Sequence, residues 1–535
     1  MRQAIEVADK AAVTPMSGVL TIRSALDRSC RWYASRPALI EGVRIVTYAQ
    51  LGDSTRRIAR GYWELGARHG DRVAFLCNGT IDHALSYYAA QRIGTIAVNL
   101  HLRETTHYQI KLLRRLEPKI LVFDAEKSAV AQELAAVFPS LRLVCIGQTS
   151  DRKATLLSEL LTCSGDELAV TIRDDDPAII QLSSGSTGVA KALVHSNASV
   201  LESWTGGLYM WSGIAPQDRF LNAFAPSFVV WLVHGGSFLN HGAAVVFQPR
   251  WDPTIFIEAV QDHRITCAAL TSTQWRATLA TKTGEGELTS LRMAAYLGEK
   301  MASDKLRELT RRVCPEFRSF YGMSECLGIG GCVIRSQDFT EAGKWGSVGK
   351  PSINSDLRIA EVGALRVTEK PPGEIGEIVV RAASFALFNW GDPGWRDRVL
   401  TEDGWYRTGD LGHVDEDGYV YLDGRVDNQI ATGGIKIAAE EIEQVIEKNP
   451  DVAAVAVVGV DDERWGQRIV AFVVLRNEGL SAHALDAWCR TDGNLAGFQC
   501  PKEWHFVNSL PQTSVGKLDR RSLRQQFIVE SSKSA

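Results

Sequence analysis

The chain has 535 residues and a formal net charge of −4, with 45% hydrophobic and 23% charged residues. This length predicts several domains with a large core, and the small net charge argues against nucleic acid or an anionic membrane surface as the main partner. We expect a cytoplasmic protein, because the apolar runs are shorter than the roughly 18 residues that span a bilayer, the N-terminus lacks the apolar core of a signal peptide, and the ten cysteines contain no CxxC pair.

The chain up to about residue 342 alternates helical and strand patterns. Leu51, Ile58 and Tyr62 fall on one face of a helix predicted over residues 48–66. Further helices are predicted over 83–94, 254–263 and 304–313, and strands over 71–77, 96–100, 119–124, 141–146, 178–182, 243–247 and 266–270. This alternation predicts an α/β fold with largely parallel sheets.

The composition changes from about residue 343. Glycine and proline become frequent, and short β-rich runs at 357–359 and 377–381 indicate a small barrel-like subdomain. A compact terminal block then predicts helices over 438–448 and 482–490 and strands over 452–460, 468–475 and 502–507. We therefore predict a large N-terminal domain (1–424), a hinge (425–427) and a small, mobile α+β C-terminal domain (428–535).

A loop of small, hydroxyl-bearing residues follows the strand predicted over 178–182. It consists of Ser183, Ser184, Gly185, Ser186, Thr187 and Gly188, and Lys191 comes just beyond it. Glycines let a backbone approach an anion closely, and N–H groups and hydroxyls can surround phosphate oxygens. The spacing differs from that of the NTPase P-loop, because no Ser or Thr follows Lys191. A solvated turn is the ordinary explanation of such a loop, so a phosphate site depends on further motifs.

Five stretches occur in a recognisable order along the chain. They are SSGSTGVAK (183–191), YGMSE (321–325), YRTGD (406–410), GRVDNQIATGGIKI (424–437) and PQTSVGKLDR (511–520). Together they resemble the adenylate-forming superfamily, which comprises acyl-CoA synthetases, adenylation domains of peptide synthetases and luciferases. The resemblance covers roughly residues 20–528. It implies that a carboxylic acid reacts with ATP to give an acyl adenylate and pyrophosphate, and that a thiol then takes the acyl group.

The resemblance implies roles for residues that would bind ATP. The 183–191 loop would hold the β- and γ-phosphates with Lys191 as its cation, and Glu325 would bind Mg²⁺, which favours carboxylate oxygens. The remaining nucleotide-binding positions are Tyr321 on the adenine with Gly322 and Ser324 of the same motif, Gly298 and Glu299 beside it, Asp410 on the ribose, and Arg425 on the ribose or phosphate. A solvated acid is the alternative for Glu325, and a turn-capping residue is the alternative for Asp410.

The C-terminal block carries the implied catalytic cation and the implied thiol channel. Lys517 would bridge the substrate carboxylate and the α-phosphate, with a surface lysine as the alternative. Asp427 matches the family hinge, and Gly433 and Gly434 would leave room for a pantetheine arm. The phosphate loop departs from the family pattern at one point, since the usual Pro-Lys-Gly is Ala190, Lys191 and Ala192 here.

The segment 225–235 indicates the class of acid. Val229 stands where amino-acid-activating relatives carry an Asp, and a valine cannot pair with an ammonium group, so an α-amino acid is disfavoured. The residues predicted for the acyl pocket are Phe228, Val229, Trp231, His234, Met323 and Gly330, with core packing as the alternative for His234. They suggest an apolar pocket for a fatty, aryl-alkyl or alicyclic acid.

We therefore predict an ATP-dependent acyl-CoA synthetase that uses ATP, Mg²⁺ and coenzyme A. A freestanding adenylating enzyme that loads a separate carrier protein is the alternative, and an inactive nucleotide-binding protein is a third hypothesis. The sequence shows no carrier-protein domain with an attachment serine up to Ala535, which favours coenzyme A. The oligomeric state is open, with a homodimer as one option.

Overall fold

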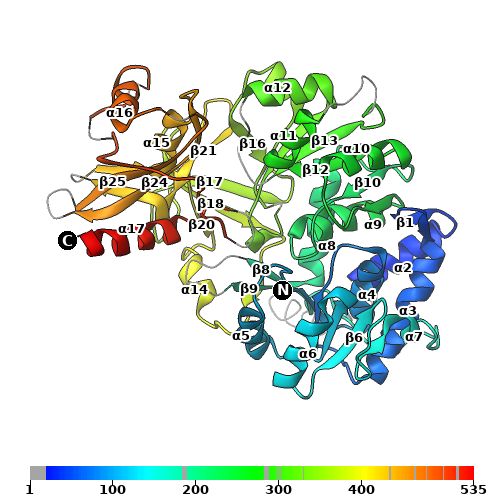
Figure 1. The fold of residues 1–535 in the computed structure, drawn as a ribbon. Coiled ribbons are helices and arrows are strands. Elements are labelled where there is room, and N and C mark those ends of the chain that lie inside the picture. Colours follow the sequence, from blue (N-terminus) through cyan, green and yellow to red (C-terminus); the bar gives the residue numbers. More distant parts are fainter. Residues whose placement is uncertain are drawn as a thin grey trace, which may run out of the picture. The chain divides into compact units, whose positions relative to one another are not determined.

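The computed structural model describes residues 20–183, 190–281, 288–297, 301, 303–328, 330–432, 435–462, 466–477, 479–493, 495–497, 499–513 and 517–534. These residues form two compact units (Figure 1). The larger unit comprises the described residues up to 356 together with 381–398, and the smaller unit comprises 357–380 and those from 399 onward. The predicted α/β fold class is confirmed, whereas the mobile-domain boundary at 425–427 stays a prediction.

The larger unit contains a complete eight-stranded sheet. Its strand order is β19-β9-β8-β4-β3-β5-β6-β7. The bounds are β3 (Arg72–Leu76), β4 (Ile96–Asn99), β5 (Ile120–Asp124), β6 (Arg142–Ile146), β7 (Thr155–Leu156), β8 (Pro177–Ser183), β9 (Lys191–Ser196) and β19 (Phe388–Asn389). The strands from β8 to β7 in this order run parallel, while β9 is antiparallel to both β8 and β19.

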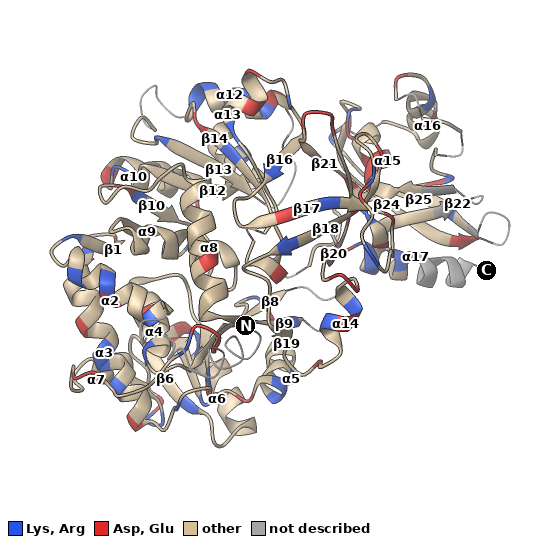
Figure 2. Cartoon of the chain, turned by 180° about the vertical axis from the view of Figure 1, so that it is seen from behind, with Lys and Arg blue, Asp and Glu red and all other residues tan. Residues whose placement is uncertain are grey.

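A second series of strands in the larger unit has the order β16-β15-β14-β13-β12-β10-β11-β1-β2. The bounds are β1 (Pro37–Glu41), β2 (Arg44–Thr47), β10 (Arg219–Asn222), β11 (Ala244–Phe247), β12 (Cys267–Thr271), β13 (Met293–Leu297), β14 (Phe317–Tyr321), β15 (Cys332–Ile334) and β16 (Ser347–Pro351). The six strands from β14 to β1 are parallel, and β2, β15 and β16 pair antiparallel. The central strands β12 and β13 carry no charged residue (Figure 2), as expected of strands covered on both faces.

Helices cover both sheets of the larger unit. The main ones are α2 (Ile22–Trp32), α3 (Tyr48–Glu64), α4 (Ile81–Arg92), α5 (Thr106–Leu116), α6 (Ser128–Val137), α7 (Leu157–Leu160), α8 (Asn197–Met210), α9 (Gly236–Asn240), α10 (Pro253–Asp262), α11 (Ser272–Ala280), α12 (Ser303–Arg312), α13 (Ser336–Thr340) and α14 (Trp395–Val399). Helix α3 shows why they form. Thr47 caps its N-terminus reciprocally with Gln50, and Leu51, Ile58 and Tyr62 are fully buried on one face.

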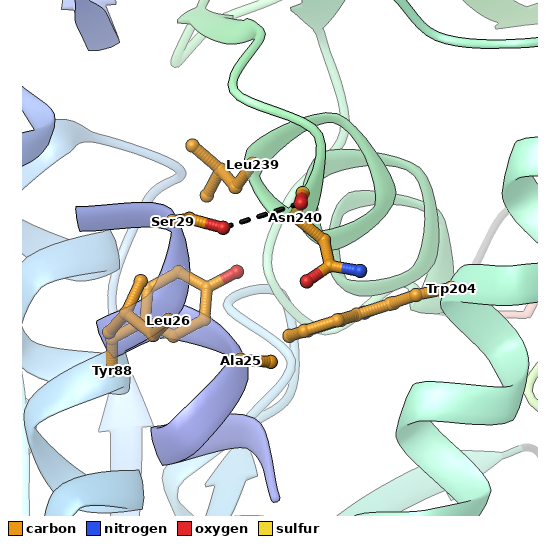
Figure 3. A pocket seen from close by; sticks show the side chains of 7 residues that line it. All are labelled: Ala25, Leu26, Ser29, Tyr88, Trp204, Leu239 and Asn240. Carbon is orange, nitrogen blue, oxygen red and sulfur yellow. Dashed lines mark hydrogen bonds between the residues drawn. The ribbon is translucent and has the colours of Figure 1, made fainter. Parts of the chain in front are cut away.

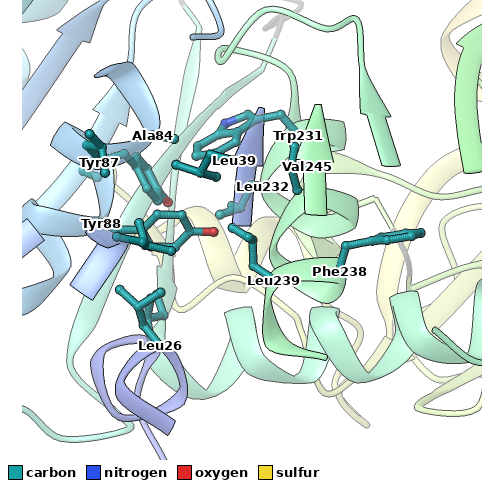
Figure 4. Packing of buried hydrophobic residues seen from close by; sticks show 14 of the residues in the cluster. Leu26, Leu39, Ala84, Tyr87, Tyr88, Trp231, Leu232, Phe238, Leu239 and Val245 are labelled. Carbon is teal, nitrogen blue, oxygen red and sulfur yellow. The ribbon is translucent and has the colours of Figure 1, made fainter. Parts of the chain in front are cut away.

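Successive residues of a parallel strand point to opposite faces of the sheet and pack in different hydrophobic cores. In β3, Val73 and Phe75 pack with α3 and α4, whereas Ala74 and Leu76 pack with α5 and α6. The first of these cores also contains Leu39 and Val245 of the other sheet, so α3, α4, α8 and α9 form a layer shared by both sheets. Figure 4 shows this core where Tyr87 and Tyr88 of α4 meet Trp231, Leu232 and Leu239. The outer face of the second sheet packs against α10, α11 and α12.

The smaller unit contains two β structures. The first has the order β17-β18-β20-β21, with β17 (Ser355–Ala360), β18 (Gly376–Ala382), β20 (Tyr406–Val414) and β21 (Val420–Arg425). Residues 355–356 of β17 and 381–382 of β18 fall in the ranges of the larger unit. The second joins β23 (Ile435–Ala438), β22 (Gln429–Thr432), β25 (Gly466–Leu475) and β24 (Val452–Asp462), with β26 (Glu503–Phe506) on β25. Helices α15 (Ala439–Ile446), α16 (Ala482–Thr491) and α17 (Arg520–Ser534) complete the unit.

The strands and helices that the sequence predicts are present in the structure. The seven strands predicted up to residue 270 have observed bounds within one residue of the expected ones, as β5 at Ile120–Asp124 illustrates. All ten cysteines lie in the described ranges and are free thiols, most of them buried. Among the described residues, no helix is long and apolar enough to cross a membrane.

Candidate active site

Two of the predicted site residues of the larger unit form an ion pair. Lys191 begins β9, and its Nζ lies 2.9 Å from Oε1 of Glu325. Glu325 lies in a single 3-10 turn, η3 (Ser324–Cys326), and its side chain is only 8% exposed. Burial of a carboxylate is costly unless a cation pairs with it, so Lys191 makes this position tenable. The fold thereby joins two motifs that are 134 residues apart.

The turn that carries Glu325 is hydrogen-bonded to residues 384–386, a segment of the same unit that is distant in the sequence. The N–H of Ala386 donates to the carbonyl of Glu325 at 2.8 Å, and Oγ of Ser384 donates to the carbonyl of Cys326 at 2.8 Å. His195 on β9 in turn donates from Nδ1 to the carbonyl of Ser384 at 3.2 Å. Burial lowers the pKa of His195 to about 4, so this imidazole is neutral near pH 7. None of His195, Ser384 and Ala386 belongs to a motif singled out in the sequence.

The glycines around this motif are required by close approaches of the chain. A side chain at Gly322 would overlap the carbonyl oxygen of Gly328, and one at Gly330 would overlap Cβ of Cys326. Tyr321, the last residue of β14, is buried. The YGMSE motif is therefore a tight turn at the carboxyl end of a parallel strand, where open α/β sheets bind ligands.

The phosphate loop is described only at its two ends. Ser183 and Lys191 face each other across the antiparallel pair β8–β9, so the strands end together on either side of the loop. Several predicted residues lie outside the described residues, namely Ser184, Gly185, Ser186, Thr187, Gly188, Gly298, Glu299, Gly433 and Gly434. Their roles stay predictions.

In the smaller unit, Asp410 and Arg425 are direct cross-strand partners on β20 and β21. Nη1 of Arg425 lies 2.5 Å from Oδ1 of Asp410 and also donates to the carbonyl of Thr408 at 3.2 Å. Gly409, between Thr408 and Asp410 in the sequence, has φ +71°, a left-handed conformation that favours glycine. The YRTGD and GR motifs thus form one charged pair on neighbouring strands.

The remaining predicted residues of this unit are exposed. Asp427 lies in the 3-10 turn η4 (Val426–Asn428) directly after β21. Lys517 has an exposed side chain, while its backbone N–H donates to Oγ1 of Thr513 and its carbonyl accepts from the N–H of Thr513. The next residues lead into α17, whose first turn Asp519 caps through the N–H of Ser522. Lys517 therefore stands at the base of a small loop with its ammonium in solvent.

The predicted acyl-pocket residues divide into two groups. Phe228, Val229 and Met323 are half-buried, and Cγ1 of Val229 lies 3.1 Å from the position that a Cβ on Gly328 would take. The loop after β14 therefore lies against the segment 225–235 at Val229. The lining of an acyl pocket by these residues stays a prediction.

Trp231 and His234 belong to the second group, which lies in the core. They fall in a π-helical turn, η2 (Trp231–Gly235), and the ring of Trp231 lies 4.9 Å from those of His83 and Tyr87 between centroids (Figure 4). Nε1 of Trp211 donates to Nδ1 of His234 at 3.0 Å. Burial lowers the pKa of His234 to about 3, so it is a neutral core residue, in line with the alternative considered for it.

A small pocket opens between α2 and α9, away from these motifs. Its lining comprises Ala25, Leu26, Ser29, Tyr88, Trp204, Leu239 and Asn240 (Figure 3). Ser29 donates to the carbonyl of Asn240 at 3.3 Å across it. The lining contains none of the residues predicted for ATP or for the acid.

Comparison with known families decides the identity. The model of the AMP-binding enzyme family matches residues 26–388, and the model of the AMP-binding enzyme C-terminal domain matches residues 441–517. The chain belongs to the AMP-binding enzyme family. The predicted membership of the adenylate-forming superfamily is thereby confirmed, and this AMP-binding enzyme is a ligase that activates an acid with release of AMP.

Similar proteins are matched along nearly their whole length. The chain is 30% identical over 510 residues to an indoleacetate–CoA ligase of Aromatoleum aromaticum, covering 94% of this chain and 97% of that protein. It is 28% identical over 502 residues to the fatty acid–acyl-carrier-protein ligase ScoC of Streptomyces coeruleorubidus, covering 93% and 94%. Among solved structures, ATP-bound MatB from Rhodopseudomonas palustris has a TM-score of 0.83 at 24% identity, covering 95% of this chain and 99% of that one. This last likeness concerns the fold.

Proposed function

We propose that this AMP-binding enzyme is an ATP-dependent acyl-CoA synthetase for an apolar carboxylic acid. The observation that carries the proposal is the Lys191–Glu325 pair at 2.9 Å, a cation and a buried acid next to the end of the phosphate loop. Such a pair provides the two kinds of group that handle a nucleoside triphosphate, a cation for phosphate oxygens and a carboxylate for a divalent metal. The indoleacetate–CoA ligase relative supports coenzyme A as the acceptor.

In this proposal the first half-reaction joins the acid to ATP. The carboxylate oxygen of the acid attacks the α-phosphorus, the bond from that phosphorus to the bridging oxygen breaks, and pyrophosphate leaves. Lys191 neutralises phosphate charge, and Lys517 stabilises the charge where the two anions meet. Asp410 accepts hydrogen bonds from the ribose hydroxyls, with Arg425 orienting its carboxylate. Mg²⁺ fits the carboxylate of Glu325 by donor chemistry, and it would supply positive charge to the triphosphate.

The second half-reaction forms the thioester. The thiol of coenzyme A gives up its proton to solvent, its sulfur attacks the acyl carbon, the bond from that carbon to the AMP oxygen breaks, and AMP leaves. We propose that residues around the hinge at Asp427 allow the change of conformation between the two steps, and that Gly433 and Gly434 leave room for the pantetheine arm. Val229 and Phe228 would contact an acid without an α-ammonium group.

One experiment tests both half-reactions. Pyrophosphate release is measured with ATP, Mg²⁺ and a panel of fatty, aryl-alkyl, alicyclic and amino acids, and mass spectrometry then detects the thioester with coenzyme A or with an acyl-carrier protein. We expect release with apolar acids and a CoA thioester. A thioester on the carrier protein alone would favour the second candidate, which the ScoC relative supports. Release with amino acids alone would contradict the proposed substrate class.

A further inference from the structure

The residue before Lys191 is held by two side chains of helix α5. The N–H of Ala190 donates to the hydroxyl of Tyr108 at 2.9 Å, and Nη1 of Arg115 donates to the carbonyl of Ala190 at 3.0 Å. Both polar groups of this backbone residue are therefore bonded to one helix. Tyr108 lies near the start of α5 and is half-buried, while Arg115 lies in its last turn.

The residue after Lys191 is held from the other side. The N–H of Ala192 donates to Oδ1 of Asn389 at 2.8 Å, and the N–H of Trp390 donates to the carbonyl of Ala192 at 2.8 Å. Nη2 of Arg115 joins the two sides, because it donates to Oδ1 of Asn389 at 3.0 Å and also to the carbonyl of Trp390. The guanidinium of Arg115 thus holds Ala190 directly and Ala192 through Asn389 and Trp390, on either side of Lys191.

From these contacts we propose that Tyr108 and Arg115 are positioning residues for Lys191. A lysine side chain is long and flexible, so the place of its ammonium depends on where its backbone is fixed. Fixing Ala190 keeps Lys191 within 2.9 Å of Glu325 and lowers the entropic cost of ordering it on a phosphate. This inference rests on the proposed function of Lys191 as the phosphate cation.

The hydroxyl of Tyr108 needs an N–H at position 190 as its partner. Proline has no N–H and a fixed φ, so the proline usual before this lysine would offer Tyr108 nothing to bond. Ala190, the departure noted in the sequence, supplies that N–H. In this chain a hydrogen bond from α5 thus fixes a backbone position that proline would fix through its ring.

A double-mutant cycle between Tyr108→Phe and Ala190→Pro tests the coupling, with Tyr33→Phe, directly after α2, as the matched control of the same substitution. We expect Tyr108→Phe to raise the KM for ATP and its calorimetric Kd about three- to tenfold, the value of one net hydrogen bond, with kcat nearly unchanged. In the Ala190→Pro background the same change has no further effect, because the donor is gone. Thermal unfolding of Tyr108→Phe stays close to that of the parent.

Several outcomes would overturn the inference. The inference fails if Tyr108→Phe binds ATP as tightly as the parent. It also fails if the effects of Tyr108→Phe and Ala190→Pro on the Kd for ATP are additive. Where Ala190→Pro fails to fold, Arg115→Gln takes its place, and an unchanged Kd for ATP in Arg115→Gln counts against positioning. The Lys191→Met variant distinguishes a failure of the proposed function of Lys191 from a failure of the positioning role of Tyr108 and Arg115. If it binds ATP like the parent, the proposed function of Lys191 fails, whereas a weakened Lys191→Met with an unaffected Tyr108→Phe contradicts only the positioning.

Discussion

The guanidinium of Arg425 lies 2.5 Å from the carboxylate of Asp410, its direct partner across β20 and β21. The side chain of Asp410 is 18% exposed and that of Arg425 is 42% exposed, so the acid is the more enclosed member. Arg425 thereby fixes the direction of the acid that we propose for the ribose.

Asp410→Asn tests the ribose assignment. The amide keeps the shape but loses the negative charge, so we expect the calorimetric Kd for ATP to rise about tenfold, as for a hydrogen bond to a charged group. Asp423→Asn is the matched control, since Asp423 pairs with His413 on the same two strands. Equal effects of both substitutions would show that Asp410 has no special part in nucleotide binding.

Lys191→Met tests the buried ion pair through stability. It leaves the carboxylate of Glu325 buried without its partner, so we expect the free energy of unfolding in urea to fall by about 1–3 kcal/mol. Lys191→Met with Glu325→Gln removes both charges and restores part of the loss. A double variant no more stable than Lys191→Met would contradict the pairing.

Lys517→Ala separates the two half-reactions. We expect pyrophosphate release to fall about 10²–10³-fold, a typical loss for one electrostatic contact to a transition state. Thioester formation from a supplied acyl adenylate stays near the parent rate, because that step no longer involves two approaching anions. Lys502→Ala is a control, since Lys502 binds the carbonyl of Gly497 in the same unit. Equal loss in both half-reactions would refute the assignment.

Val229→Asp tests the acyl-pocket prediction. A carboxylate at this half-buried position next to Gly328 either stays charged at a cost of several kcal/mol or takes up a proton. We expect the KM for the preferred acid to rise while the Kd for ATP is unchanged. Val229→Asn provides a neutral isostere, and its smaller effect would identify charge as the cause. Unchanged activity of Val229→Asp would place this residue away from the acid.

Three buried histidines predict acid sensitivity. Burial lowers the pKa values of His83 and His195 to about 4 and that of His234 to about 3, against about 6.5 in the unfolded chain. Between pH 6.5 and 4 the unfolded chain binds more protons than the folded one. The free energy of unfolding therefore falls as the pH falls, by up to about 1.4 kcal/mol per pH unit for each histidine.

Urea unfolding at pH 7, 6 and 5 measures this slope. His234→Asn removes one titrating group, while its Oδ1 can still accept from Nε1 of Trp211. We expect a shallower slope in this variant. A stability that is independent of pH over this range would show that the three imidazoles are not buried in solution.

Motifs predicted Lys191, Glu325, Asp410 and Arg425 individually. Hydrophobic patterns predicted other strands of the same sheets, such as β8 and β12, but not β9, β14, β20 or β21, which carry or precede these four residues. The sequence could not pair Lys191 with Glu325, because their contact depends on how β9 and β14 are ordered in two different sheets. The sequence also left two environments open for His234, the core or the acyl pocket. In the structure His234 lies in a π-helical turn and accepts a hydrogen bond from the buried Trp211.

The sequence also missed Tyr108, Arg115 and Asn389. None of them lies in a motif, and each acts through a hydrogen bond whose partner is backbone far away in the chain. One signal was present. Ala190, in place of the usual proline, offers a backbone N–H that needs a partner when it is buried, yet nothing in the residue pattern indicates which helix supplies it.

The membership of residues 381–398 in the larger unit has a consequence for synthesis on the ribosome. Residues up to 356 emerge first. The edge of β9 can pair only after β19 has been made, and the turn with Glu325 can form its hydrogen bonds only after Ser384 and Ala386 have been made. Residues 357–380 of the smaller unit are made in between. The larger unit therefore cannot finish folding before residues 357–380 of the smaller one have been translated, and these residues remain without β20 until the chain beyond 399 is made.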